Sequence, residues 1–220
     1  MKRSKLKLLI KEGTLVQAPG AYDALTAKLI QSLEFNAVYM TGYGTSAGMF
    51  GYPDLGLLTM TEMVYNAARI ADAVDIPLIA DADTGYGNPI NVMRTVRDFE
   101  KAGAAAIHIE DQTWPKRCGH MHGKSIIDAN EMAGKIKAAV DTRRDQDFLI
   151  IARTDAIDTD GLDHAIERAN LYAESGADIL FIEAPVDIAQ VEEIPKRINS
   201  IPHLLNLAPK TPNLSKEIIS

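Results

Sequence analysis

The chain has 220 residues, 46% of them hydrophobic, and a chain of this length buries most of its unfolded-state surface in a core. Its formal net charge of −7 provides no broad basic surface, which argues against a nucleic-acid-binding protein. A single cysteine excludes an intrachain disulfide and no apolar stretch is long enough to span a bilayer, so we expect a cytoplasmic protein without nucleic-acid or membrane partners.

The chain opens with a basic, partly apolar segment, MKRSKLKLLIKEG. Lys7 interrupts the apolar run, which leaves it too short for a signal-peptide core, and no small-residue cleavage site follows. We therefore expect an amphipathic helix at the N-terminus.

Short β-rich runs then alternate with longer helical ones. We expect strands at 14–18, 37–41, 77–83, 105–110, 148–154, 178–184 and 203–208. Helices are expected between them, at 21–34, 59–74, 90–103, 130–144, 161–176 and 187–199. Alternation at this spacing indicates βα units and a parallel sheet.

The fold class that fits this pattern is α/β, as a (β/α)₈ TIM-type barrel whose eighth strand and C-terminal helices would lie beyond residue 220. A doubly wound sheet is the alternative, because strand count alone does not separate the two. No low-complexity tract or Gly/Ser linker divides the chain. We therefore expect residues 1–220 to form a single barrel domain that is incomplete on its C-terminal side.

Polar residues gather where the expected strands end, which in a parallel barrel is the active-site face. They are Asp81 and Asp83, His108 and Glu110, Arg153, Glu183 and Asn206, with Asp54 in the loop after the second strand. Residues two apart on a strand point to one face, so Asp81 and Asp83 should project together, and Glu110 should join them from the neighbouring strand. Clustered carboxylates need a cation, and an all-oxygen shell suits Mg²⁺ or Mn²⁺ better than zinc. The alternative is that Asp81 and Asp83 cap the following turn.

Arg153 follows the hydrophobic run FLIIA, which would place its guanidinium at the mouth of the barrel. There it could bind a carboxylate through two hydrogen bonds, or pair with one of the acids. Glu183 could accept a proton or a hydrogen bond, or pair with Arg153.

The segment KRCGH holds the only cysteine, Cys118, directly after two basic residues. Nearby cations favour the thiolate, which leaves an acid/base, a redox cysteine and a nucleophile open. His120 and His122 form an H-x-H pair, but no matching Cys/His cluster lies nearby, so a zinc site is not expected. Trp114, beside Pro115, is expected to pack against the base of this loop.

The motifs GYPDLG, DADTGYG, HIEDQ, KRCGH, IIARTDA and IEA occur in this order from about the second to the seventh expected strand. Together they resemble the isocitrate lyase/phosphoenolpyruvate mutase superfamily, and most closely its 2-methylisocitrate lyase branch. The resemblance implies a TIM-barrel enzyme of propionate metabolism, a homotetramer that depends on Mg²⁺, with Mn²⁺ as a possible substitute. It would cleave a carbon–carbon bond of 2-methylisocitrate by retro-aldol chemistry, which yields pyruvate and succinate.

The resemblance also implies roles for particular residues. Asp81 and Asp83 would hold Mg²⁺, with Asp54 and Glu110 in the shell through water. Cys118 would be the catalytic acid/base on a mobile loop with Gly119 and Gly123 near its hinges. The substrate would be bound by backbone N–H groups of Thr41, Gly42 and Tyr43 and by Arg153, Glu183, Asn206, Gly119 and His120, with Arg153 and Glu183 also catalytic.

The sequence departs from the superfamily pattern at a few positions. Thr41 stands where many members have Ser, and the segment around Asn206, Thr211 and Pro212 lacks the glycine that usually precedes the Thr-Pro pair. Further substrate-binding arginines, and a helix that members exchange between subunits, would lie beyond residue 220.

Other activities of the superfamily remain open: a dimethylmalate lyase, an oxaloacetate hydrolase or decarboxylase, and a carboxyphosphonoenolpyruvate phosphonomutase. Members that handle phosphonates generally lack KRCGH, so Cys118 argues against the last of these. A barrel that only binds a partner would be expected to lose the acidic shell, whereas all four acids are present here.

Overall fold

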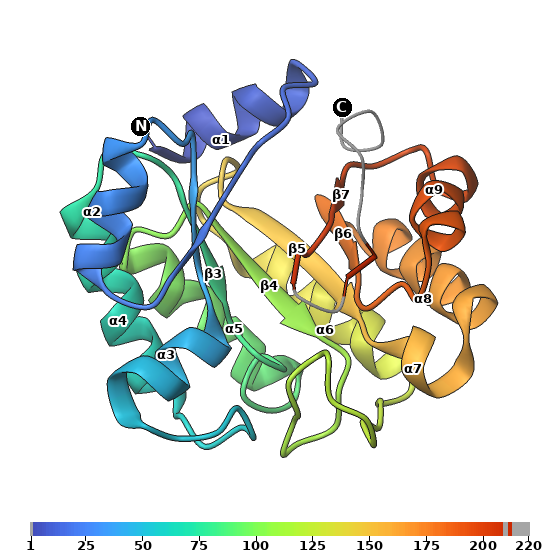
Figure 1. The fold of residues 1–220 in the computed structure, drawn as a ribbon. Helices are drawn as coiled ribbons and strands as arrows, with labels where there is room; N and C mark the ends of the chain where they lie inside the picture. Colours follow the sequence, from blue (N-terminus) through green and yellow to red (C-terminus); the bar gives the residue numbers. More distant parts are fainter. Residues whose placement is uncertain (1, 209–210, 213–220) are drawn as a thin grey trace.

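The computed structural model describes residues 2–208 and 211–212, so the end of the expected 1–220 domain lies outside the described residues. Within them, parallel strands form one sheet whose spatial order is the chain order, and Figure 1 shows this sheet curling around an interior. The strands are β1 (Gly20–Ala21), β2 (Val38–Met40), β3 (Leu78–Asp81), β4 (Ala106–Glu110), β5 (Leu149–Thr154), β6 (Ile179–Ile182) and β7 (His203–Leu204). A doubly wound sheet reverses its order at a switch point, so the sequential order excludes that alternative and confirms a TIM-type architecture.

Helices cover the outer face of the sheet, as the periodicity predicts (Figure 1). The N-terminal helix is also confirmed. The predicted helices are α1 (Lys2–Lys11), α2 (Ala24–Ser32), α4 (Met60–Ala73), α5 (Pro89–Lys101), α6 (Ala129–Thr142), α8 (Leu162–Glu174) and α9 (Ile188–Arg197). Among the residues with a described position, none of these helices combines the length and apolar character needed to cross a bilayer.

Two short helices were not predicted: α3 (Gly42–Phe50) after β2 and α7 (Ala156–Asp160) after β5. The sequence of α3 is rich in glycine, which disfavours helix and suggests a turn. The residues at its two ends nevertheless stabilise a helix. The Thr41 side chain accepts a hydrogen bond from Gly44 N at the start, and Gly51 adopts a left-handed conformation at the end.

The prediction for the first strand was wrong in position, because residues 14–18 are extended but unpaired and β1 lies at Gly20–Ala21. The alternating pattern of 14–18 reflects partial burial instead, since Val16 and Ala18 pack against the interior cluster while Leu15 is exposed. The alternating pattern indicates which side chains are buried, but it does not indicate which residues pair with a neighbouring strand.

The strands β3 to β6 are buried on both faces, as parallel strands are, and their side chains divide into two layers. One alternate set packs outward against the helices. The other points inward, where apolar residues from β3 to β6 meet Leu6 of α1, which covers the N-terminal end of the barrel. Along β5 the inward set runs Leu149, Ile151 and then Arg153. The interior therefore changes from apolar to polar toward the C-terminal end of the strands.

Candidate active site

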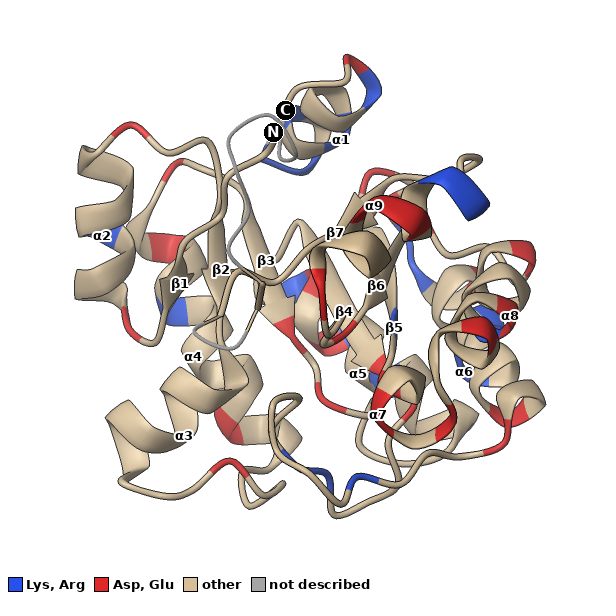
Figure 2. Ribbon diagram, turned by 45° about the vertical axis from the view of Figure 1, so that its right-hand side comes forward, with Lys and Arg blue, Asp and Glu red and all other residues tan. Residues whose placement is uncertain are grey.

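A layer of charged side chains occupies the C-terminal end of the barrel. The strand register places Asp81 beside His108, and Glu110 beside Arg153. Glu183 follows β6 directly. Figure 2 shows acidic positions where the central strands meet the loops at the lower end of the view, with basic positions on the loop beneath them. Opposite charges therefore face one another across the mouth of the barrel.

Lys116, from the loop after β4, lies among the predicted metal ligands. Its Nζ is 2.6 Å from Asp54 Oδ1 and 2.9 Å from Asp83 Oδ1, and all three side chains are largely buried. Burial raises the pKa of Asp83 to about 6 and also raises that of Asp54. Burial opposes the charge on Lys116, but the carboxylates of Asp83, Glu110, Asp81 and Asp54 together hold its pKa well above the ordinary value. Lys116 thus pairs directly with two of the four acids, Asp54 and Asp83, and is attracted by the charges of Asp81 and Glu110.

Asp81 is satisfied by hydrogen bonds within the chain. Its Oδ1 lies 3.0 Å from His108 Nε2 and accepts the Asp83 N–H at 2.9 Å, while Oδ2 accepts the Gly42 N–H at 3.1 Å. Burial opposes ionisation of both groups, yet the mutual attraction of Asp81 and His108 lowers the pKa of the aspartate well below its usual range and raises that of the histidine to about 9. The contact with Asp83 N matches the turn-capping alternative, so Asp81 both caps and takes part in the charged layer.

Asp83 reaches the cluster by a different route from the predicted one. The strand β3 ends at Asp81, and Asp83 has a positive φ of 46°, so the two acids do not share a strand face. The tight turn after the strand brings them together instead. A carboxylate two residues from a strand end can therefore join the site without strand alternation.

The acids fit a hydrated Mg²⁺ ion better than one that is ligated by several side chains. Asp83 Oδ1 and both oxygens of Glu110 are buried and lack a well-directed hydrogen bond, although Lys116 and Arg153 lie within ionic distance. In the described part of the chain, no three His, Cys, Asp or Glu side chains converge closely enough to ligate one ion directly. Mg²⁺ commonly retains several waters and binds through one or two carboxylates. Asp81 was expected to be a direct ligand, but both of its oxygens already have partners, so Asp83 and Glu110 suit the ion better, with Asp54 and Asp81 near.

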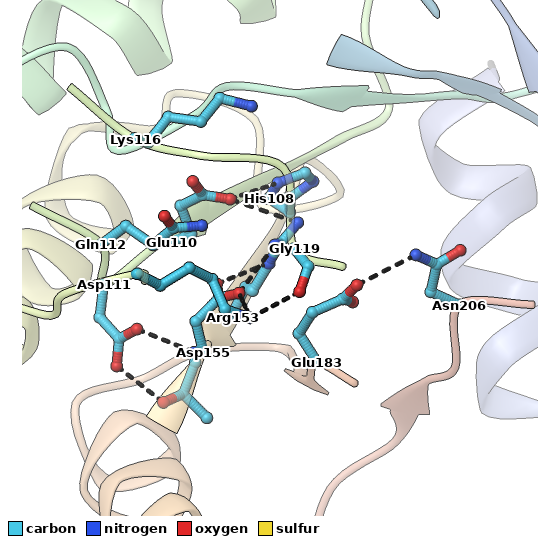
Figure 3. Close-up of polar contacts among 12 residues, drawn as sticks. His108, Glu110, Asp111, Gln112, Lys116, Gly119, Arg153, Asp155, Glu183 and Asn206 are labelled. Carbon is cyan, nitrogen blue, oxygen red and sulfur yellow. Dashed lines mark hydrogen bonds and ion pairs between the residues drawn. The ribbon is translucent and has the colours of Figure 1, made fainter. Parts of the chain in front are cut away.

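Arg153 is held by carboxylates on two sides (Figure 3). Its Nε and Nη2 donate to Asp155 at 2.9 and 3.0 Å, and its Nη1 lies 3.2 Å from Glu110 Oε2. The guanidinium carbon lies 5.1 Å from the centre of the Phe181 ring. Arg153 is therefore an ion-paired, oriented guanidinium at the barrel mouth.

Glu183 connects strand β6 to two further predicted substrate residues. Its Oε1 is 3.2 Å from His120 Nε2 and accepts a hydrogen bond from Asn206 Nδ2 at 3.3 Å. Asn206 Nδ2 and His120 Nε2 are 3.4 Å apart, and Figure 3 shows Asn206 facing Glu183. Glu183 Oε2 is buried with no hydrogen-bond donor among the described residues. Loops that are far apart in sequence thus converge on one carboxylate.

We refer to residues 112–126, between β4 and α6, as the lid. Its base is closed by a bridge between Gln112 and Ile126 and by the Thr113 N–H bond to Ser125 O at 2.8 Å. At its tip, Cys118 is partly buried and its N–H donates to Asp54 O at 3.2 Å. The lid therefore places the cysteine next to the acidic cluster.

Gly119 packs closely against the barrel. A Cβ there would lie 2.4 Å from Arg153 Nη2 and 2.6 Å from Glu183 Oε1, so a side chain at this position would displace both groups. The basic residues before the cysteine have partners of their own. Lys116 pairs with Asp54 and Asp83, and Arg117 donates to the His122 carbonyl at 3.4 Å.

The predicted carboxylate-binding segment forms the start of α3. Thr41 is the N-cap, and a Cβ on Gly42 would lie 2.4 Å from Asp81 Oδ2, so this backbone packs directly on the acidic layer. The Gly42 N–H is donated to Asp81, and the Tyr43 side chain is 60% exposed. Gly42 therefore belongs to the cluster, whereas Tyr43 points outward.

His120 and His122 do not form a shared site, because His122 lies 3.3 Å from Asp158 at the surface while His120 meets Glu183. Trp114 packs as predicted at the base of the loop, where a Cβ on Gly56 would touch its ring and Tyr86 lies 6.3 Å away between ring centres.

The sequence reasoning missed three buried charged residues of this region. They are Asp111, Lys124 and Asp155. Asp111 accepts hydrogen bonds from Tyr172 OH at 2.8 Å, from Thr154 Oγ1 at 2.7 Å and from the Asp155 N–H at 3.0 Å. Asp111 follows Glu110 directly and Asp155 lies two residues beyond Arg153, so a search extended by two residues past each strand end would have found both aspartates. Lys124 lies within the long loop after β4, where no local signal marks it.

The chain matches a known family over nearly its whole length. The family model described as phosphoenolpyruvate phosphomutase matches residues 6–219. The chain is 59% identical over 196 residues to 2,3-dimethylmalate lyase of Eubacterium barkeri, which covers 89% of this chain and 66% of that one. It is 46% identical over 212 residues to 2-methylisocitrate lyase of Aeropyrum pernix, which covers 96% and 68% respectively. The chain thus spans about two thirds of the length of these curated relatives.

A solved structure shows the same fold. The crystal structure of a 2,3-dimethylmalate lyase, described as a PEP mutase/isocitrate lyase superfamily member, aligns with a TM-score of 0.95 and 38% sequence identity. The alignment covers 100% of this chain and 76% of that chain.

Proposed function

Since the chain belongs to the phosphoenolpyruvate phosphomutase family of the PEP mutase/isocitrate lyase superfamily, we propose that it is a Mg²⁺-dependent carbon–carbon lyase. Its substrate would be a 2-hydroxy-2-methyl di- or tricarboxylate, which retro-aldol cleavage converts to pyruvate and a second carboxylic acid. The observation that supports this proposal is the main-chain bond between Cys118 and Asp54, because it ties the residue that carries the only thiol of the chain to the backbone of one of the acids.

Arg153 and Glu183 would bind and orient the substrate. Asp155 holds the Nε and Nη2 edge of the Arg153 guanidinium, and the remaining N–H groups would donate to a substrate carboxylate. Glu183 Oε2 has no donor in the described structure and would accept the proton of the substrate hydroxyl. Asn206 and His120 hold the other oxygen of Glu183 and so fix the direction of the free one.

Asp83 and Glu110 would hold Mg²⁺, with Asp54 and Asp81 around it through water. When bound, the ion would supply positive charge that stabilises the hydroxyl oxygen of the substrate and the substrate carboxylate on which negative charge develops. As the carbon–carbon bond breaks, its electron pair goes to the carbon next to the second carboxylate. Cys118 would then give its thiol proton to that carbon, and the lid would exclude water meanwhile.

Two substrates of this class stand first. The sequence motifs point to 2-methylisocitrate, which would give pyruvate and succinate. The higher identity to a 2,3-dimethylmalate lyase, 59% against 46%, favours 2,3-dimethylmalate, which would give pyruvate and propionate. Both share the group that Arg153 and Glu183 would recognise, so the second product distinguishes them.

The test is a product assay on the full-length protein with Mg²⁺ and, in separate reactions, 2,3-dimethylmalate, 2-methylisocitrate, isocitrate and oxaloacetate. We expect pyruvate from one of the first two, with propionate or succinate detected by NMR, and no turnover after treatment with EDTA. Turnover of isocitrate or oxaloacetate alone would contradict the proposed substrate class, and unchanged turnover in EDTA would contradict the metal requirement.

A further inference from the structure

Asp155 is a buried carboxylate that makes different contacts from those that its position at a helix start predicts. It is the N-cap residue of α7, and aspartate at an N-cap ordinarily accepts a hydrogen bond from the first turn of its helix. The Asp155 side chain makes no such bond. Both of its oxygens instead point to cations from other parts of the site.

Those cations are Arg153 and Lys124. Arg153 donates to both Asp155 oxygens, through Nε to Oδ2 and Nη2 to Oδ1 (Figure 3). Lys124, near the C-terminal end of the lid, donates to Asp155 Oδ1 at 2.9 Å and to the Gly119 carbonyl at 2.5 Å. The substrate arginine and the lid therefore share one carboxylate oxygen.

Loss of this shared contact would be costly, because the side chains that make it are buried. The Lys124 side chain is 1% exposed and Asp155 is 0% exposed, and lysine is seldom buried so completely unless it is paired. Removing one member of a buried pair leaves the other charge uncompensated, which costs far more than the loss of a surface pair. The lid is therefore held on the barrel by the buried Lys124–Asp155 pair, which water does not replace.

The backbone of Asp155 is also fixed from behind. Its N–H donates to Asp111 Oδ1, and Asp111 is itself held by Thr154 and Tyr172. Gly119, whose carbonyl receives Lys124, packs against Arg153 and Glu183. Asp155 is therefore held in place from three sides, by Lys124 of the lid, by Arg153 and by the buried Asp111.

We propose that Asp155 is a positioning residue that ties the lid to the substrate arginine, with one carboxylate orienting Arg153 and seating Lys124 of the closed lid. This inference rests on the proposed function for the role of Arg153, whereas the lid contact stands independently of it. Asp155 does not touch the substrate in this proposal. It acts through Arg153 and through the lid.

The test compares three variants of the full-length protein. Asp155→Asn removes the shared charge at constant shape, and Lys124→Met removes only the lid's cation. Lys137→Met is the matched control, because Lys137 makes a pair of similar length with Asp141, 3.0 Å, but the two side chains are 70% and 61% exposed. The first readout is limited trypsin cleavage after the exposed Arg117, without metal or ligand, followed by mass spectrometry.

We expect cleavage after Arg117 to become faster by about tenfold in Asp155→Asn and in Lys124→Met, because each loses a buried charge pair, and to stay unchanged in Lys137→Met. Cleavage after Arg94, in helix α5, is followed in the same digest. A loosened lid accelerates only the first cut, whereas general unfolding accelerates both. An unchanged rate after Arg117 in either buried-pair variant, or equal acceleration after Arg94, overturns the lid contact.

The second readout is the affinity for oxalate, a two-carbon analogue of the pyruvate product, in the presence of Mg²⁺. It is followed through the fluorescence of Trp114, the only tryptophan of the chain, at the base of the lid. Asp155→Asn should weaken binding by about tenfold and by more than Lys124→Met, because only the former frees Arg153. Equal weakening in both variants overturns the orienting role. Absence of oxalate binding to the wild-type protein contradicts the proposed function instead, while the cleavage rates still decide the lid contact.

Discussion

At the scale of single residues, the ammonium group of Lys116 is the unexpected neighbour of the acids assigned to a metal. It lies within ionic distance of Asp54 and Asp83, and it explains how several carboxylates are buried together. The same lysine precedes Cys118 by two residues. One of the two basic residues before the cysteine therefore pairs directly with the acidic cluster.

Cys118 carries the first prediction. Cys118→Ser should lower kcat by about 10²–10⁴-fold, because a hydroxyl is a much weaker proton donor than a thiol at the same position. Steady-state kinetics with the substrate found by the product assay would measure this loss.

The control is the affinity for Mn²⁺ measured by EPR, which should stay as in the wild-type protein because the thiol is not among the acids proposed to hold the ion. Turnover near the wild-type level in Cys118→Ser would remove the thiol from the reaction.

At the scale of elements, the helix starts follow local chemistry. Thr59 begins α4 with a capping box, in which its side chain accepts the Glu62 N–H and Glu62 accepts the Thr59 N–H. Asn88 begins α5 in the same manner, with Pro89 at the first helical position. These signals lie within four residues of one another, so the start of each helix depends on the local sequence.

The cap of α4 gives the second prediction. Thr59→Ala should lower the free energy of unfolding by about 1 kcal/mol, because the Glu62 N–H loses its acceptor at the helix start. Urea unfolding followed by circular dichroism would measure the difference.

Thr14→Ala is the control, since Thr14 is exposed and lies outside any helix. Its effect should stay within about 0.5 kcal/mol. Equal effects of the two substitutions would show that the cap contributes nothing to the stability of the fold.

At the scale of the whole molecule, α1 covers the end of the barrel opposite the lid (Figure 1). Leu6 is fully buried against the inward residues of β3 to β6, whereas Leu8, two residues along the same helix, is 53% exposed. The apolar interior near α1 and the charged layer near the lid are therefore two ends of one filled barrel.

Leu6 provides the third prediction. Leu6→Ala should lower the free energy of unfolding by about 2–5 kcal/mol, because it leaves a cavity at the closed end of the barrel. Leu8→Ala, the same change on the exposed side of the helix, should cost about 0.5 kcal/mol or less. Denaturant unfolding of both variants tests the pair, and similar losses would mean that α1 does not seal the interior.

Much of the fold follows from the sequence by itself, because its signals are local. Alternation of β-rich and helical runs predicted a parallel sheet and favoured a barrel, and the polar residues at strand ends, such as Glu110 and Arg153, identified the face that carries the candidate site. The pattern at 14–18 misplaced the first strand, because partial burial produces the same alternation as pairing does.

Only the tertiary structure decided which charges meet. Lys116 and Asp54 are separated by 62 residues in the chain, and Lys124 and Asp155 by 31, yet each pair is in direct contact. Distances of this kind depend on how the lid folds over the strand ends, which no local periodicity encodes. The sequence by itself therefore determined the parallel α/β sheet and the polar residues at its strand ends. The tertiary structure decided that the strands follow one another in barrel order, and the packing of the lid determined which charges pair, because the partner of a buried charge is set by three-dimensional proximity.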